Sequence, residues 1–180
     1  MARLNVVTPE QANGQTRELY DAIKAAVGGV PNIYQGIGNS PAALAGVLQL
    51  GETLKKGQLT AAEIEAIKLA VSELYGCDYC LAAHTLLGRK AGLSDAEVID
   101  ARRGTSRSPR LGALVAFVRA AVEPRARVTD DDLAVLRAAG FNDGQIAEAL
   151  LVIAQTVFTN LFNRVHRTPL DFPAAPKLNA

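Results

Sequence analysis

The chain of 180 residues lacks tryptophan, and aromatic side chains of any kind make up only 5% of it. Cysteine, histidine and methionine are also scarce, with two, two and one residues. Apolar residues nevertheless reach 49%, and alanine and leucine are prominent among them. This composition disfavours a β-sandwich and is typical of close-packed helices. Because strand-like alternation is also missing, we predict an all-α fold.

The chain also lacks an excess of charge of either sign, since 19 basic and 18 acidic residues leave a formal net charge of +1. A nucleic-acid partner is therefore not expected, and the basic stretch 101–110 is interpreted as a solvated connector. No run of 18 apolar residues and no signal-peptide pattern is found, so we expect neither a membrane span nor secretion. The apolar stretch 146–162 is interpreted as a buried helix, and a cytoplasmic location is expected.

Helix start signals recur along the whole chain. They combine capping residues with proline or with an acidic or amide residue three positions later, at Thr8, Ser40, Thr60, Ser94, Pro109, Thr129 and Asn142. We predict one domain over 1–180, which consists of N-terminal helices over about 8–57, a cysteine-containing core over about 58–104, C-terminal helices over about 108–168 and an extended tail over 169–180.

An internal similarity links two segments of the chain, 59–80 and 141–162. Each segment has a capped amphipathic start followed by a long apolar stretch. We interpret the pair as a duplicated helical hairpin, of which the second copy lacks the cysteines.

The two cysteines and one of the two histidines gather in the stretch YGCDYCLAAHT, residues 75–85. On a helix starting near residue 77, Cys77, Cys80 and His84 lie along one stripe, with both cysteines in the first turn. Free backbone N–H groups and the helix dipole lower the pKa of a thiol there. The spacing thus places an attacking thiol, a resolving thiol and a proton acceptor within two helical turns.

Three plainer interpretations compete with a redox dithiol. Two buried cysteines can fall three apart by chance on an apolar helix, although Gly76 and Asp78 indicate a helix start where access is easier. A structural zinc site needs four ligands, and this cluster supplies three. A structural disulfide is disfavoured in a reducing compartment. We therefore favour the redox dithiol.

The string Glu65-x11-Cys77-x2-Cys80-x3-His84 resembles the core signature of the alkylhydroperoxidase D-like proteins, within the carboxymuconolactone decarboxylase superfamily. The segments VPNIYQGIGNSPAAL (30–44) and LDFP (170–173) are similar to its peroxidase-related subgroup. The resemblance implies a compact multi-helix fold that assembles into trimers or hexamers. It also implies a peroxidase that reduces hydroperoxides through a dithiol/disulfide cycle without a metal or another cofactor.

Carried over by position, the resemblance makes Cys80 the peroxidatic thiol and Cys77 the resolving thiol. Glu65 becomes the general base of a proton relay, with His84 as a second member. The position between the cysteines, which holds a further histidine in members with the best-developed relay, is Tyr79 here. Its hydroxyl can pass a proton, but it is a poorer base at neutral pH. The expected reductant is an external dithiol or a thioredoxin-like or lipoyl protein.

Some residues of this set have ordinary alternatives. Glu65 projects roughly 130° from the apolar stripe of its own helix, a position that usually belongs to a solvated carboxylate. Tyr79 is equally well explained as an aromatic wall. His166, at the end of a predicted helix, is interpreted as compensation of the helix dipole.

Two other functions remain open from the sequence. One is a dithiol–disulfide exchange adaptor that serves a partner peroxidase. The other is a non-enzymatic helical oligomer that binds a metal or a small ligand at the cysteine cluster.

Overall fold

A computed structural model of the chain describes residues 1–123 and 127–178, and in these ranges it contains nine α-helices and no β-strand. The all-α prediction is confirmed. Residues 179–180, the end of the predicted tail, lie outside the described ranges. The helices are α1 (Gly14–Val27), α2 (Asn32–Ile37), α3 (Pro41–Leu54), α4 (Ala61–Leu74), α5 (Asp78–Lys90), α6 (Asp95–Arg103), α7 (Pro109–Val122), α8 (Asp130–Ala138) and α9 (Asp143–His166).

The helix starts follow the capping chemistry of the sequence. Reciprocal capping boxes begin α4, α6, α8 and α9, and a serine cap followed by proline begins α3 and α7. Each such cap satisfies a backbone N–H group that the helix leaves unpaired, and contributes about 1 kcal/mol.

The start of α1 is an exception, because the helix predicted to follow Thr8 begins at Gly14 instead. The Thr8 carbonyl accepts hydrogen bonds from the N–H groups of Gln11 and Ala12, both at 3.0 Å, which closes one isolated turn. The Gln11 side chain caps that turn by accepting from the Thr8 N–H at 3.1 Å. Asn13 is then extended, with φ −136° and ψ 170°, and ends it.

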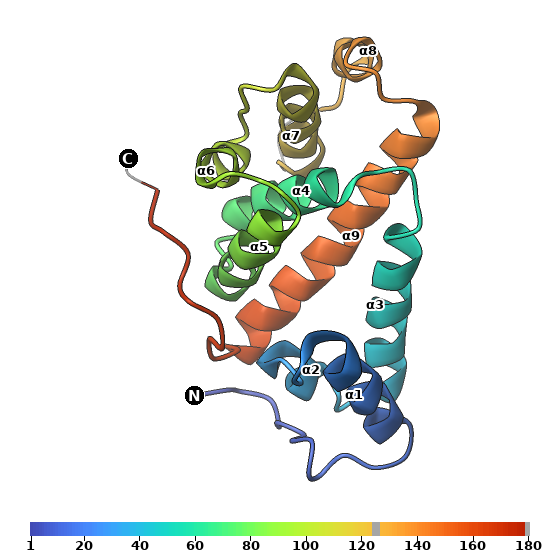
Figure 1. Cartoon of the computed structure of the whole chain (residues 1–180), viewed down its shortest axis with the longest axis vertical. Helices are drawn as coiled ribbons and strands as arrows, with labels where there is room; N and C mark the ends of the chain where they lie inside the picture. The colour runs from blue at the N-terminus through green and yellow to red at the C-terminus, as the bar shows by residue number, and fades with distance from the viewer. Residues whose placement is uncertain (124–126, 179–180) are drawn as a thin grey trace.

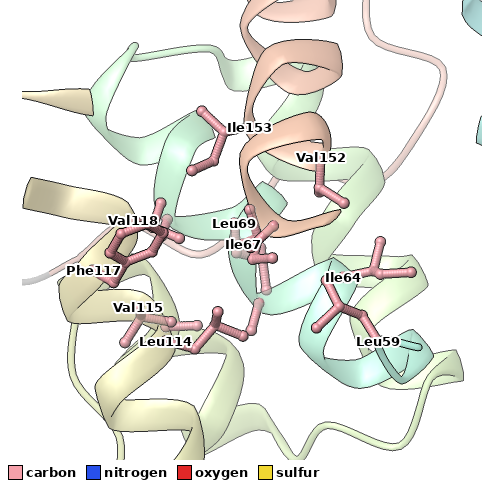
Figure 2. Packing of buried hydrophobic residues seen from close by; sticks show 14 of the residues in the cluster. Leu59, Ile64, Ile67, Leu69, Leu114, Val115, Phe117, Val118, Val152 and Ile153 are labelled. Atoms are coloured by element: carbon pink, nitrogen blue, oxygen red, sulfur yellow. The ribbon is translucent and has the colours of Figure 1, made fainter. Parts of the chain in front are cut away.

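Helix α4 lies at the centre and packs against α5, α6, α7 and α9. Helix α9 runs diagonally across the molecule, with α1 and α2 near its C-terminal end, α8 near its N-terminal end and α3 alongside it (Figure 1). Figure 2 shows side chains of α4, α7 and α9 meeting in the larger core, among them Leu69, Leu114 and Val152. A smaller core joins α1, α2 and α3 to the start of α5 and contains both cysteines.

The stretch interpreted as a buried helix is helical, but α9 is buried on one face only. Its opposite face exposes the large apolar side chains Leu150, Leu151, Phe158, Leu161 and Val165.

Among the described helices, α9 is the one long and apolar enough to cross a membrane by length and composition, with a mean hydropathy of 1.4 over a stretch that is 28% buried. The core helix of a folded domain has the same properties, and α9 packs against α2, α3, α4, α5 and α7.

The internal similarity does not correspond to two hairpins. Residues 59–80 form α4, a turn and the start of α5, whereas residues 141–162 lie almost wholly in the uninterrupted helix α9. The first segment turns at Gly76, whose φ of 58° suits glycine. The equivalent position of the second segment is Phe158, which continues the helix.

His166 is also placed differently from the prediction. It is fully buried, and its Nδ1 accepts a hydrogen bond from the Leu4 N–H at 3.3 Å. Its ring packs against Phe162, and a Cβ at Gly36 would come within 2.8 Å of it. Burial lowers the pKa of His166, so the ring does not act as a cation at the helix end.

Candidate active site

The turn between α4 and α5 places the cysteines at the start of a helix, as predicted. Gly76 reverses the chain, and the Cys77 N–H donates to the Ser72 carbonyl at 3.1 Å. Cys77 is the N-cap of α5, and its Sγ accepts a hydrogen bond from the Cys80 N–H at 3.3 Å. A sulfur atom therefore occupies the capping position usually taken by an oxygen of serine, threonine or aspartate.

Cys77 and Cys80 form a disulfide across this first turn, with their Cα atoms 5.3 Å apart. The side chains are only 2% and 3% exposed, so the expected easy access from bulk solvent is wrong. The second core covers them because α1, α2 and α3 pack over the start of α5. Access is instead through a cavity that Cys80 lines.

Glu65 and His84 meet beside this turn, although nineteen residues separate them along the chain. One Glu65 carboxylate oxygen lies 2.8 Å from His84 Nδ1, and the other accepts from Lys68 Nζ at 2.9 Å. Glu65 is 8% exposed, so the alternative of a solvated surface carboxylate is wrong. Glu65 is buried by tertiary packing. Helix α5 packs across the face of α4 that lies outside the apolar stripe of α4.

The two cationic or polar neighbours of Glu65 determine the pKa of its carboxyl group. Burial by itself raises the pKa of Glu65, but the neighbouring His84 and Lys68 outweigh burial and hold the pKa at about 2. An ionised carboxylate only accepts hydrogen bonds, so His84 Nδ1 carries the hydrogen between the two groups, and Nε2 is the ring nitrogen left for a further partner. A carboxylate with so low a pKa is itself a weak base.

The hydrogen bond and the ring contact of Tyr79 are with residues other than the cysteines and His84, although it lines the same cavity. Its hydroxyl accepts a hydrogen bond from the Ile33 N–H at 3.3 Å, and its ring packs edge-on against Phe172 at 5.6 Å between ring centres. Burial and the carboxylate of Asp171 raise the pKa of Tyr79 well above its usual value. These contacts agree with the interpretation of Tyr79 as an aromatic wall.

Asn163 on α9 is a contact of Cys80 that the sequence motif does not include. Its Nδ2 donates to Cys80 Sγ at 3.2 Å, and the side chain is buried. The sequence carries a signal for it, because Thr156, Asn160 and Asn163 form a polar stripe at helical spacing on an apolar helix. Buried polar groups in such a stripe need partners, and here one partner is a sulfur atom.

The cavity beside Cys80 has a volume of about 720 Å³ and lies between α5, α9, the end of α1 and the C-terminal tail. Its wall is largely apolar, and among its polar groups Asn163 contacts Cys80 directly. The polar side chains of the wall are Tyr34, Lys68, Tyr79, His84, Lys90, Gln155, Thr156, Thr159, Asn163 and Asp171. An apolar cavity with a few convergent polar groups is typical of a small-molecule site.

Two other features of the described residues bear on the choice of site. A hollow of about 450 Å³ near the N-terminus is lined by residues such as Asn5, Gln11 and Asn39, without a titratable side chain. Within residues 1–123 and 127–178, no group of three or more His, Cys, Asp or Glu side chains is placed to hold a metal ion. The cavity at Cys80 is therefore the candidate active site.

We expect Glu65→Gln to remove part of the pH dependence of stability. Because the folded-state pKa of Glu65 is lowered from 4.5 to about 2, its ionised form stabilises the fold above about pH 4.5. That contribution, at most about 3 kcal/mol, is lost as the pH falls from about 5 to about 2. Urea unfolding of both proteins across this range measures it.

The free energy of unfolding should therefore differ most between wild type and Glu65→Gln above about pH 5 and converge as the solution is acidified. The other carboxylates are common to both proteins and cancel in the comparison. A difference that stays constant over the whole range would contradict the assigned pKa.

The structure combines an all-helical fold with a Cys-x-x-Cys pair at the start of a helix, and several solved structures share this fold. A peroxidase-related protein of Ralstonia eutropha JMP134, described as an alkylhydroperoxidase AhpD core, superposes with a TM-score of 0.83 at 22% identity, over 94% of this chain and 92% of that chain. A peroxidase-related protein of Silicibacter sp. TM1040 gives 0.73 at 23% identity, over 86% and 84%. The debrominase Bmp8, as a C82A variant in complex with 2,3,4-tribromopyrrole, gives 0.76 at 18%, over 95% and 94%.

Residues 41–123 match the model of the Carboxymuconolactone decarboxylase family, which confirms the family resemblance predicted from the sequence. The matched segment begins with α3 and includes the whole of α4 and α5, and therefore Glu65, both cysteines and His84. No curated protein matches the chain significantly.

Proposed function

We propose that this protein is a thiol-dependent peroxidase that reduces organic hydroperoxides or hydrogen peroxide. The observation that carries the proposal is the position of Cys80, which is disulfide-bonded to Cys77 and also lines a cavity shared with His84. Peroxide reduction needs a thiol in reach of a small substrate, a second thiol to resolve the product and a base for the thiol proton.

The oxidative half-reaction begins with the reduced pair. His84 Nε2 takes the proton of the Cys80 thiol, and the thiolate attacks the terminal oxygen of the hydroperoxide. The O–O bond breaks, the leaving alkoxide takes the proton from His84 as alcohol, and Cys80 becomes a sulfenic acid. The Cys77 thiol then condenses with it, which forms the disulfide and releases water. Glu65 holds the His84 ring and stabilises its charged form.

The reductive half-reaction uses the same geometry in reverse order. An external dithiol attacks Cys80 Sγ, the sulfur that faces the cavity, and Cys77 leaves as a thiolate. Its Sγ already accepts the Cys80 N–H, which favours this charge. The second external thiol then releases Cys80. We propose a cytoplasmic dithiol of the thioredoxin-like or lipoyl kind, and a trimer or hexamer in which the exposed apolar face of α9 is covered.

A dithiol–disulfide exchange adaptor is the second candidate. The burial of both sulfurs distinguishes the adaptor from the peroxidase, since Cys80 is 3% exposed and is reached through the cavity. A hydroperoxide or a slender lipoyl arm fits such an approach better than a bulky protein disulfide. Access therefore favours the peroxidase.

Rates on three substrates test this choice. With a dithiol reductant in excess, the wild-type protein should consume cumene hydroperoxide or hydrogen peroxide faster than it reduces a protein disulfide. Lipoamide, which is slender, should also react. Fast exchange with the protein disulfide and no consumption of either peroxide would refute the peroxidase in favour of the adaptor.

A further inference from the structure

Cys80 Sγ has a side-chain hydrogen-bond donor that lies outside the Glu-Cys-Cys-His set. Asn163 Nδ2, from α9, lies 3.2 Å from the sulfur, although 83 residues separate the two along the chain. Asn163 is 5% exposed and also lines the cavity. The two sulfurs therefore differ in their donors, because Cys77 receives a backbone N–H of its own helix and Cys80 receives a side-chain amide.

The orientation of this amide is set from both sides. A disulfide sulfur carries no hydrogen, so only the NH₂ end of the amide can bond to Cys80. The oxygen end accepts a hydrogen bond from the Thr168 hydroxyl at 2.6 Å. The two hydrogen bonds require the same orientation of the Asn163 amide. A reduced Cys80 thiolate also only accepts hydrogen bonds, so the amide would keep this orientation.

The backbone at the end of α9 is shaped to bring Thr168 back onto Asn163. Arg167 has a φ of 55° and is the one non-glycine residue with positive φ over residues 1–123 and 127–178. The Thr168 N–H donates to the Asn163 carbonyl at 3.2 Å, which closes this turn. A left-handed conformation is unfavourable for arginine, so the rest of the structure must hold it there.

We propose that Asn163 is a further catalytic residue, which donates a hydrogen bond to the Cys80 thiolate, and that Thr168 is the residue that positions it. This inference rests on the proposed function in assigning the attack to Cys80. A donor that bonds more strongly to the charged sulfur than to the neutral thiol favours ionisation. The bond gives Cys80 a donor of its own, as the Cys80 N–H does for Cys77, so a thiolate at Cys80 is stabilised when the hydroperoxide arrives.

The pH dependence of alkylation at each cysteine tests the proposal. Reduced full-length proteins are treated with iodoacetamide at a series of pH values, and the label on Cys80 and on Cys77 is quantified separately by peptide mass spectrometry. In Asn163→Leu and Asn163→Asp we expect the Cys80 midpoint to rise by about one pH unit or more, a tenfold change in the ionisation constant. The aspartate is nearly isosteric and places a negative charge against the thiolate.

Matched variants separate this role from a structural one. Thr168→Val should shift the Cys80 midpoint in the same direction by less, and Thr168→Ser should restore the wild-type value because it keeps the hydroxyl. Asn160→Leu removes another buried asparagine of α9, whose amide donates to the Thr156 carbonyl at 2.8 Å, and should leave the midpoint unchanged.

The proposal is overturned if Asn163→Asp, with a wild-type far-UV spectrum and cooperative melting, alkylates at Cys80 with the wild-type midpoint. It is equally overturned if Asn160→Leu shifts the midpoint as much as Asn163→Leu does. This readout contains no peroxide, so it is independent of turnover. A wild-type protein without peroxidase activity would refute the proposed function and still leave the midpoint comparison decisive for Asn163.

Discussion

Replacing Cys80 with serine is expected to lower dithiol-dependent peroxide reduction by at least about a thousandfold. A serine hydroxyl stays protonated at neutral pH and does not attack a peroxide oxygen, so no sulfenic acid forms at position 80. The substitution is nearly isosteric, and the Asn163 amide can still donate to the new hydroxyl oxygen. The loss is therefore chemical rather than structural, and steady-state peroxide consumption at neutral pH measures it.

Cys77→Ser is the matched control for this prediction. It removes the resolving thiol and therefore slows turnover, but it keeps the attack on the first equivalent of peroxide. The two variants are therefore distinguished most clearly in a single turnover without reductant. Turnover of Cys80→Ser within about tenfold of the wild-type rate would contradict the assignment of the attacking thiol.

Replacing His84 with glutamine is expected to slow peroxide reduction at neutral pH by about a hundredfold. Glutamine can still hydrogen-bond Glu65, but it cannot take the proton of the Cys80 thiol. The defect should shrink as the pH rises past about 8.5, where a thiol ionises without help. The pH profile of the second-order rate constant with hydrogen peroxide measures both effects.

Glu65→Gln is the control that separates the base from its partner. It should lower the same rate by less than His84→Gln does, and the two changes together should cost less than the sum of their separate effects, because both act on one relay. A rate for His84→Gln equal to wild type at neutral pH would contradict the role of His84. A defect that persists undiminished at about pH 10 would do so as well.

The sequence predicts the helices well because their starts depend on local chemistry. Thr60, Ser94, Thr129 and Asn142 all cap helices in the predicted way, since a cap involves residues only three positions apart. Thr8 shows the limit of such signals. Its N–H donates to the Gln11 side chain as in a capping box, but the extended backbone of Asn13 ends the turn, and α1 begins only at Gly14.

The candidate site is predictable only in part, because several of its contacts are tertiary. Cys77 and Cys80 at a helix start follow from spacing alone. The burial of Glu65 does not, because on its own helix it lies off the apolar stripe and only the packing of α5 covers it. The contact of Asn163 with Cys80 is harder still to predict from the sequence, since the two residues are more than eighty positions apart.

The central claim is that the Cys80 sulfur attacks the peroxide and Cys77 resolves the product. Its most direct test treats reduced Cys77→Ser with one equivalent of hydrogen peroxide, traps the product with a sulfenic-acid reagent and locates the adduct by mass spectrometry. The account predicts one trapped adduct per chain, on Cys80, with consumption of the peroxide. Peroxide left unconsumed, with Cys80 still a free thiol in a folded protein, would contradict it.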